Sequence, residues 1–221
     1  MNKLFAFGCS HTYGHGLPDC IEQNNAPGPN PSKLGWVQKT GDLLDKEVIN
    51  KGECGSSNKE ILWNLIQHID LIDPEHDTLI IQWSYFERTM IIKHDPKRAD
   101  EFYAYKLAPW AKHNDNKIYY KYLHSQIDDI CSTALYINHA YMLTKHYNFK
   151  KVVMSAPPDS SGTTKFYRKK FKELLLPGLE LIEKNVTDLE IDRASDGTHA
   201  GVKTNQLYAE KLVEHYGHIL R

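Results

Sequence analysis

The sequence predicts an α/β fold in which a parallel sheet is covered by helices on both faces, a three-layer α/β/α sandwich. Two observations support this class. Short, almost wholly apolar segments such as 4–7 and 78–82 are typical of buried parallel strands. These segments alternate with stretches of helical periodicity, and right-handed crossovers then place helices on both faces of the sheet. A length of 221 residues with 41% hydrophobic residues fits a single domain of this kind.

The first predicted strand, 4–7, leads directly into a glycine-rich turn that ends at Gly16. Ser10 follows this strand, at the carboxyl end where open α/β sheets bind their ligands. Its hydroxyl is therefore expected to face the crevice. The alternative is that Ser10 only caps the next helix.

The alternation of strands and helices continues through the first half of the chain. The expected elements are an irregular loop over 17–34, a helix over 36–44, a short strand at 48–49, a helix capped by Ser56 or Ser57 and ended by Asp73-Pro74, and a strand over 78–82.

The second half contains the segment whose pattern is hardest to interpret, residues 85–123. We predict that this segment is an insertion over the crevice with local helix, and a plain surface decoration is the alternative. The elements expected after it are a helix over 124–147, a strand over 151–155, a helix over 165–184 with a break at Pro177-Gly178, a fifth strand over 187–191 and a last helix over 202–216. Together they give a five-stranded parallel sheet in one domain, 1–221.

Charge and hydropathy exclude several classes of function. The net charge of −1 gives no reason to expect nucleic acid or an anionic membrane surface as a partner. No apolar window reaches the roughly 18 residues of a membrane span, and no secretory leader is visible, so we predict a cytoplasmic protein. The four cysteines are too scattered for a disulfide framework and are expected to be free thiols, with a bridge between Cys9 and Cys54 as the alternative.

The motifs of common cofactor and metal sites are missing. Cys9, His11, His15 and Cys20 fit no zinc-ligand spacing. The glycines of 8–16 do not have the spacing of a dinucleotide fingerprint, and no phosphate-binding Gly-Lys-Ser/Thr loop occurs. The sequence therefore predicts neither a metal nor a cofactor.

A second polar motif stands just before the last predicted helix, where Asp196 and His199 are three residues apart. At this spacing both side chains can lie on one side of a turn. The carboxylate can then fix the tautomer of the imidazole and leave its other nitrogen free as a base for a serine nucleophile. A capping aspartate followed by a surface histidine is the alternative, but the motif is predicted at the same edge of the sheet as Ser10.

Three blocks of the sequence together resemble the SGNH (GDSL-type) hydrolase family. Phe7-Gly-Cys-Ser10 resembles the first block, 50–55 the second, and Asp196-Gly-Thr-His199 the last. The resemblance implies a flavodoxin-like sheet and hydrolysis of esters, often of small acyl groups on carbohydrates or lipids. It also implies that Ser10 is the nucleophile, that Asp196 and His199 complete a triad, and that the Gly55 amide donates to the oxyanion hole.

Two positions depart from the pattern of this family. Cys9 replaces the aspartate before the nucleophile, which leaves the serine in place. The third block, usually Gly-x-Asn-Asp, is replaced by 83–86 and lacks the asparagine that donates to the oxyanion. Loss of one such donor typically costs about 10²–10³ in turnover. Ser84 or Arg88 could substitute for it.

We accordingly predict a serine esterase that cleaves a carboxylic ester through a Ser10–His199–Asp196 acyl-enzyme mechanism. The predicted oxyanion hole consists of Ser10, Gly55 and Ser84, and the predicted substrate contacts are His11, Trp83, Tyr85 and Arg88. The partner is expected to be a small-molecule or glycan ester. The alternatives are a catalytically weak glycan-binding or structural module of the same fold, and an O-acyltransferase in which a sugar hydroxyl replaces water.

Overall fold

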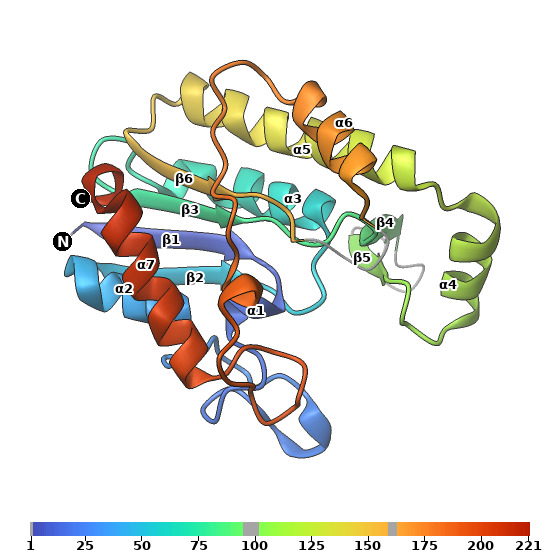
Figure 1. The fold of residues 1–221 in the computed structure, drawn as a ribbon, viewed down its shortest axis with the longest axis horizontal. Helices are drawn as coiled ribbons and strands as arrows, with labels where there is room; N and C mark the ends of the chain where they lie inside the picture. Colours follow the sequence, from blue (N-terminus) through green and yellow to red (C-terminus); the bar gives the residue numbers. More distant parts are fainter. Residues whose placement is uncertain (1, 95–101, 159–162) are drawn as a thin grey trace.

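The computed structural model describes residues 2–94, 102–158 and 163–221. A four-stranded sheet lies at its centre, in the order β2-β1-β3-β6. Its strands are β1 (Lys3–Gly8), β2 (Glu47–Gly52), β3 (Thr78–Gln82) and β6 (Lys151–Ser155), and all three pairings are parallel. The predicted α/β class is therefore confirmed (Figure 1).

Helices cover both faces of this sheet because its central strands are apolar on both sides. Phe5 and Phe7 of β1 face the cluster formed with α3 (Asn58–His68) and α5 (Gln126–His146). Leu4 and Ala6 face the opposite cluster, formed with α2 (Trp36–Leu44) and α7 (Val202–Leu220). This alternation produces the predicted three layers, which Figure 1 shows from the side.

The expected fifth strand does not form. Val186–Leu189 is instead a 3₁₀ helix, η4, because Asn185 and Asp188 form a reciprocal capping box around it. The place beside β6 is taken by a single parallel bridge between Ser155 and Ile182. Among the described residues the parallel sheet thus has four strands. Beyond its edge strand β6, only the pair Ser155 and Ile182 continues the parallel pairing.

The segment after β3 contains an antiparallel hairpin that the sequence did not predict. Its strands are β4 (Thr89–His94) and β5 (Phe102–Leu107), followed by the short helix α4 (Asn114–Ile118) and the π-helical turn η3 (Tyr119–Leu123). Residues 95–101 of the predicted insertion lie outside the described part of the chain. That residues 85–123 cover the active site stays a prediction.

The remaining elements are short or end before the predicted stop, as α3 does at His68, ahead of Asp73-Pro74. Ser57 rather than Ser56 caps α3, its hydroxyl accepting from the Glu60 amide at 3.3 Å. The helix expected over 165–184 ends earlier, as α6 (Lys165–Leu174), because the chain turns extended at Leu175 before Pro177. The others are α1 (Ser10–Tyr13), η1 (Gln23–Asn25) and η2 (Ile69–Leu71).

The structure also bears on the predictions made for the cysteines and for membrane-spanning helices. All four cysteines are free thiols, as expected, so Cys9 and Cys54 are not bridged. Among the described helices, none combines the length and the apolar character that crossing a membrane requires.

Candidate active site

Ser10 lies where β1 ends and α1 begins, in a turn that packs tightly onto β3. A side chain at Gly8 would come within 2.0 Å of Thr12 Oγ1, so only glycine allows this approach. The Thr12 hydroxyl donates to Gln82 Oε1 at 2.7 Å, which ties α1 to the end of β3. Ser10 itself is largely buried, and its hydroxyl is held at the carboxyl edge of the sheet.

The loop that carries Asp196 and His199 docks against the same turn through Gly16. Both the amide and the hydroxyl of Ser195 donate to the Gly16 carbonyl, at 3.2 and 2.8 Å. Gly16 has a φ of +85°, and a Cβ there would lie 2.8 Å from Asp196 Cγ. Glycine at position 16 is therefore required for both the backbone conformation and the space of the Asp196 side chain.

Docking of this loop brings the two ends of the chain together in one hydrogen-bonded series. His199 Nε2 lies 2.8 Å from Ser10 Oγ, although the two residues are 189 positions apart. His199 Nδ1 lies 2.5 Å from Asp196 Oδ2, while Asp196 Oδ1 accepts from the amides of Thr198 and His199. In this arrangement the carboxylate orients the ring, and Nε2 is placed to receive a proton from Ser10.

The electrostatics of the series keep the carboxylate charged and the imidazole neutral. Burial alone would raise the pKa of Asp196, but hydrogen bonds from Thr198 and His199 outweigh it and hold the pKa well below its usual range. Burial also lowers the pKa of His199, and the nearby His15 and Arg88 lower it further, against the opposing effect of Asp196. Near pH 7 His199 is therefore a neutral base.

Two more histidine rings flank His199. The rings of His11 and His15 each lie with their centroid 4.8 Å from that of His199. Burial, assisted by the charges of His199 and Arg88, lowers the pKa of His11 to about 3. Its Nδ1 is buried and has no partner among the described residues. His15 was not predicted as a site residue, and the i, i+4 spacing of the two histidines is the signal that could have indicated it.

The turn after β2 lies next to the turn that carries Ser10. The Glu53 amide donates to the Gly8 carbonyl at 3.0 Å, and the Asn50 side chain donates to the Thr12 carbonyl at 2.7 Å. Gly55 follows in this turn with a φ of +78°, a conformation that glycine adopts without strain. The structure thus brings the predicted first and second blocks to the same edge of the sheet.

The segment after β3 is divided between buried and half-buried residues. Trp83 and Ser84 are almost completely buried, at 1% and 0% exposure. The Ser84 amide donates to Asn58 Oδ1 at 2.7 Å, and Asn58 Nδ2 donates back to the Ser84 carbonyl. Asn58 therefore fixes the backbone conformation of this segment through these hydrogen bonds. This residue was not predicted from the sequence.

Tyr85 and Arg88, the other two predicted contacts in this segment, are half-buried. The Arg88 guanidinium lies 5.0 Å from the centroid of the Tyr85 ring and 4.7 Å from that of Trp110. These stacking contacts hold the planar group between two aromatic rings.

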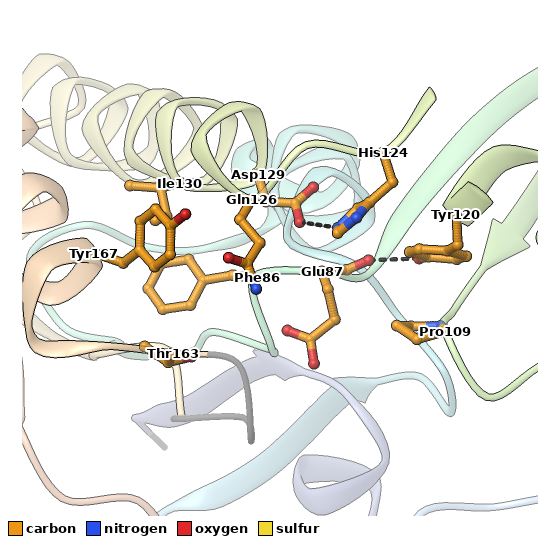
Figure 2. A pocket seen from close by; sticks show the side chains of 10 residues that line it. All are labelled: Phe86, Glu87, Pro109, Tyr120, His124, Gln126, Asp129, Ile130, Thr163 and Tyr167. Carbon is orange, nitrogen blue, oxygen red and sulfur yellow. Dashed lines mark hydrogen bonds and ion pairs between the residues drawn. The ribbon is translucent and has the colours of Figure 1, made fainter. Parts of the chain in front are cut away.

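A cavity of about 310 Å³ opens beside this segment, and its other walls come from α5, from Tyr167 of α6 and from Pro109 and Tyr120. Figure 2 shows the Glu87 carboxylate extending into the space between Phe86 and Pro109. On the far wall His124 and Asp129 form an ion pair of 2.6 Å, and burial, only partly offset by His124, raises the pKa of Asp129 to about 6. None of these residues was predicted.

Among the described residues, one group could present metal ligands. His15, Asp196 and His199 offer ligand atoms that lie within 4.8 Å of one another. All three already have partners within the chain, because Asp196 bonds to His199 and His15 Nε2 lies 2.9 Å from the Asn25 carbonyl.

Comparison with known proteins gives the fold a family resemblance. No family model and no curated protein matches the sequence. Among solved structures, esterase EstA from Pseudoalteromonas sp. is similar with a TM-score of 0.56 at 12% identity, over 99% of this chain and 97% of that one. A carbohydrate acetylesterase family member from Sinorhizobium meliloti has a TM-score of 0.52 at 11% identity, over 100% and 99% of the two chains.

A third structure, from Desulfitobacterium hafniense DCB-2, is provisionally assigned to the lipolytic proteins of the G-D-S-L family. It has a TM-score of 0.54 at 11% identity, over 97% of this chain and 99% of that one. The described chain therefore has an SGNH hydrolase-like fold along nearly its whole length, as the sequence blocks predicted.

Proposed function

We propose that this protein is a serine esterase that hydrolyses a carboxylic ester through an acyl-enzyme intermediate. The observation that carries the proposal is the series Asp196–His199–Ser10, with hydrogen-bond distances of 2.5 and 2.8 Å. A module that only binds glycans, or that serves as a structural part, does not require an imidazole aligned on a serine hydroxyl.

The first step of the proposed mechanism forms a bond between Ser10 Oγ and the ester carbonyl carbon. The Ser10 proton passes to His199 Nε2, and the carbonyl π electrons move to the oxygen, giving a tetrahedral oxyanion. Asp196 stabilises the imidazolium that results. When the intermediate collapses, the bond to the alkoxy oxygen breaks and His199 returns its proton to the leaving alcohol.

The second half of the cycle releases the acid. Water replaces the alcohol, His199 takes a proton from it, and the resulting hydroxide attacks the acyl carbon. The second tetrahedral intermediate collapses as the bond between Ser10 Oγ and the acyl carbon breaks, and His199 returns its proton to Ser10 Oγ, which frees the acid and regenerates the enzyme. The amides of Ser10 and Gly55 are the proposed oxyanion donors. Ser84, the third donor predicted from the sequence, is 0% exposed, and its hydroxyl is buried without a partner among the described residues.

The proposed substrate is a small-molecule or glycan ester that reaches the half-buried side chains His11, Tyr85 and Arg88. The neighbouring structures include proteins named as an esterase and as a carbohydrate acetylesterase family member, which supports ester chemistry for this fold. Trp83 is part of the hydrophobic core beneath this surface. We propose that Trp83 supports the segment 83–88 by packing into the core and does not contact the substrate.

The experiment compares wild type with Ser10→Ala on p-nitrophenyl acetate and longer-chain homologues. Ser10→Ala should lose roughly 10⁴–10⁶ in turnover, as expected when a triad nucleophile is removed. Ser125→Ala, at an exposed serine, serves as the control and should keep full activity. A fluorophosphonate probe read by mass spectrometry should modify Ser10. Equal release by wild type and Ser10→Ala, or an adduct on another residue, would contradict the proposal.

A further inference from the structure

Two nitrogens of the half-buried Arg88 side chain are buried without a polar partner among the described residues. Its Nε and Nη1 atoms are inaccessible to solvent, yet no described residue accepts a hydrogen bond from them. Buried polar groups are almost always hydrogen-bonded, and a buried charge without a counter-ion costs free energy. Such a group indicates that an acceptor arrives with a ligand or during the reaction.

The charge of Arg88 acts on groups on both sides of the candidate site. It lowers the pKa of His11 and of His199 on the side of the nucleophile. It also opposes the burial that raises the pKa of Cys54, the residue before Gly55. Coulombic effects of this kind fall off with distance. The same charge also acts on Tyr120, so the guanidinium lies in range of His199, of the turn that contains Gly55 and of the neighbouring cavity.

The segment that holds Arg88 is the one in which the usual oxyanion asparagine is missing. Tyr85 occupies that place, and Ser84 is unsuited to replace the donor because it is 0% exposed. The nearby Asn58 is also engaged, since its amide bonds to Ser84 and Thr133. Arg88 thus retains two free donors in this segment, whereas the amide of Asn58 is already engaged.

From these observations we propose that Arg88 donates hydrogen bonds to the tetrahedral oxyanion, in place of the asparagine of the third block. The inference rests on the esterase function proposed above. As the Ser10 Oγ–carbon bond forms, the negative charge that develops on the former carbonyl oxygen is met by a fixed cation. Stacking on Tyr85 and Trp110 holds the guanidinium plane before the reaction begins, so little reorganisation is needed.

The test compares Arg88→Met and Arg88→Lys with wild type on the neutral ester p-nitrophenyl acetate. Arg88→Met should lower kcat by about 10²–10³ with KM changed less than about threefold, because the interaction exists only in the transition state. Arg88→Lys should recover part of the loss, since it keeps the charge but loses the planar fork.

A second measurement does not depend on turnover. The rate at which a fluorophosphonate labels Ser10 should fall in parallel, because the phosphoryl oxygen occupies the place of the oxyanion. Arg168→Met is the matched control. Arg168 lies over Phe86 at the same edge of the sheet, but its Nη2 already donates to the Pro157 carbonyl at 3.0 Å. It should keep wild-type kcat and labelling rate.

The outcomes separate this inference from the proposed function. If Ser10→Ala is inactive and unlabelled while Arg88→Met matches wild type, the esterase stands and the inference is wrong. If Arg88→Met raises KM for 4-acetoxybenzoate but leaves kcat on p-nitrophenyl acetate unchanged, Arg88 recognises an anionic substrate group instead, which also overturns it. A loss of kcat with an unchanged melting temperature supports it.

Discussion

The two sides of the candidate active site are built in opposite ways. On the side of the last loop, Asp196, His199 and Ser10 are joined by hydrogen bonds of 2.5 and 2.8 Å, and each donor has found an acceptor. On the side after β3, polar side-chain atoms in the segment 83–88 are buried without a partner among the described residues. The difference indicates that the first side is complete in the free protein, whereas the second is completed only by a bound or reacting ligand.

Replacing Asp196 by Asn is expected to break the complete side most severely. The amide can donate to Nδ1 and so favour the wrong tautomer of His199, which should lower kcat on p-nitrophenyl acetate by about 10⁴. Asp192→Asn is the control, because that carboxylate bonds to Thr204 at the start of α7 and not to the ring. A loss smaller than tenfold for Asp196→Asn would remove Asp196 from the mechanism.

A methyl group at Gly16 should have the next largest effect. Its Cβ would lie 2.8 Å from Asp196 Cγ, so the carboxylate must move, and misplacement by about 1 Å can cost about 10²-fold in rate. Gly197→Ala is a matched control, since Gly197 also has a positive φ, of +70°, but a Cβ there meets nothing within 4 Å. Comparable rate losses in both variants would show that backbone strain, and not the contact with Asp196, is responsible.

The incomplete side can be probed at Asn58, which fixes the course of the segment after β3. Asn58→Leu leaves the Ser84 amide and carbonyl without partners, so we expect about 1–3 kcal/mol of lost stability in urea denaturation. It should also lower kcat by about tenfold as Arg88 shifts. Asn64→Leu, on the same helix but bonded to the Lys51 carbonyl, should leave kcat unchanged.

The smallest expected effect is a displacement of the pH profile. Protonated His199 cannot take the Ser10 proton, so kcat/KM falls as pH drops through its pKa, which burial places below the usual value of about 6.5. The charged or titratable groups around it are Asp196, His11, His15 and Arg88. His15→Gln removes one positive neighbour, so the acid limb should move to higher pH by about one unit or less.

The control for this profile is His139→Gln, at an exposed position on α5. Its acid limb should coincide with that of wild type. A limb that moves to lower pH in His15→Gln would show that the interaction of His15 with His199 has the opposite sign.

The sequence predicted the central elements well because apolar runs and breakers there agree with the final packing. The helix over Trp36–Leu44 and the strands over Thr78–Gln82 and Lys151–Ser155 form with the expected bounds. Prediction was wrong where local polar contacts outweigh hydrophobic pattern, as in the capping box that makes η4 a helix. The β4–β5 hairpin was missed because its first strand lacks the apolar–polar alternation of a half-buried strand. Ile91 and Ile92 are consecutive apolar residues, and both are exposed.

In the candidate site, too, some residues could be predicted from the sequence pattern and others could not. Ser10, Asp196 and His199 could be placed at one edge because strand ends converge there whatever the sequence separation. Asn58 and the pair His124–Asp129, which were not predicted, act through contacts between helices and loops. Those contacts depend on side-chain packing in three dimensions, for which a single sequence carries no periodic signal.

The first strand begins and the last helix ends on the side of the sheet away from α1 (Figure 1). Leu4 pairs with Thr78 in the sheet, and the Thr78 hydroxyl donates to the Leu220 carbonyl at 2.9 Å, so the first and last elements meet there. A tag, a fusion partner or a linker to a solid support can therefore be attached at either end, and the crevice will still face the surrounding solution.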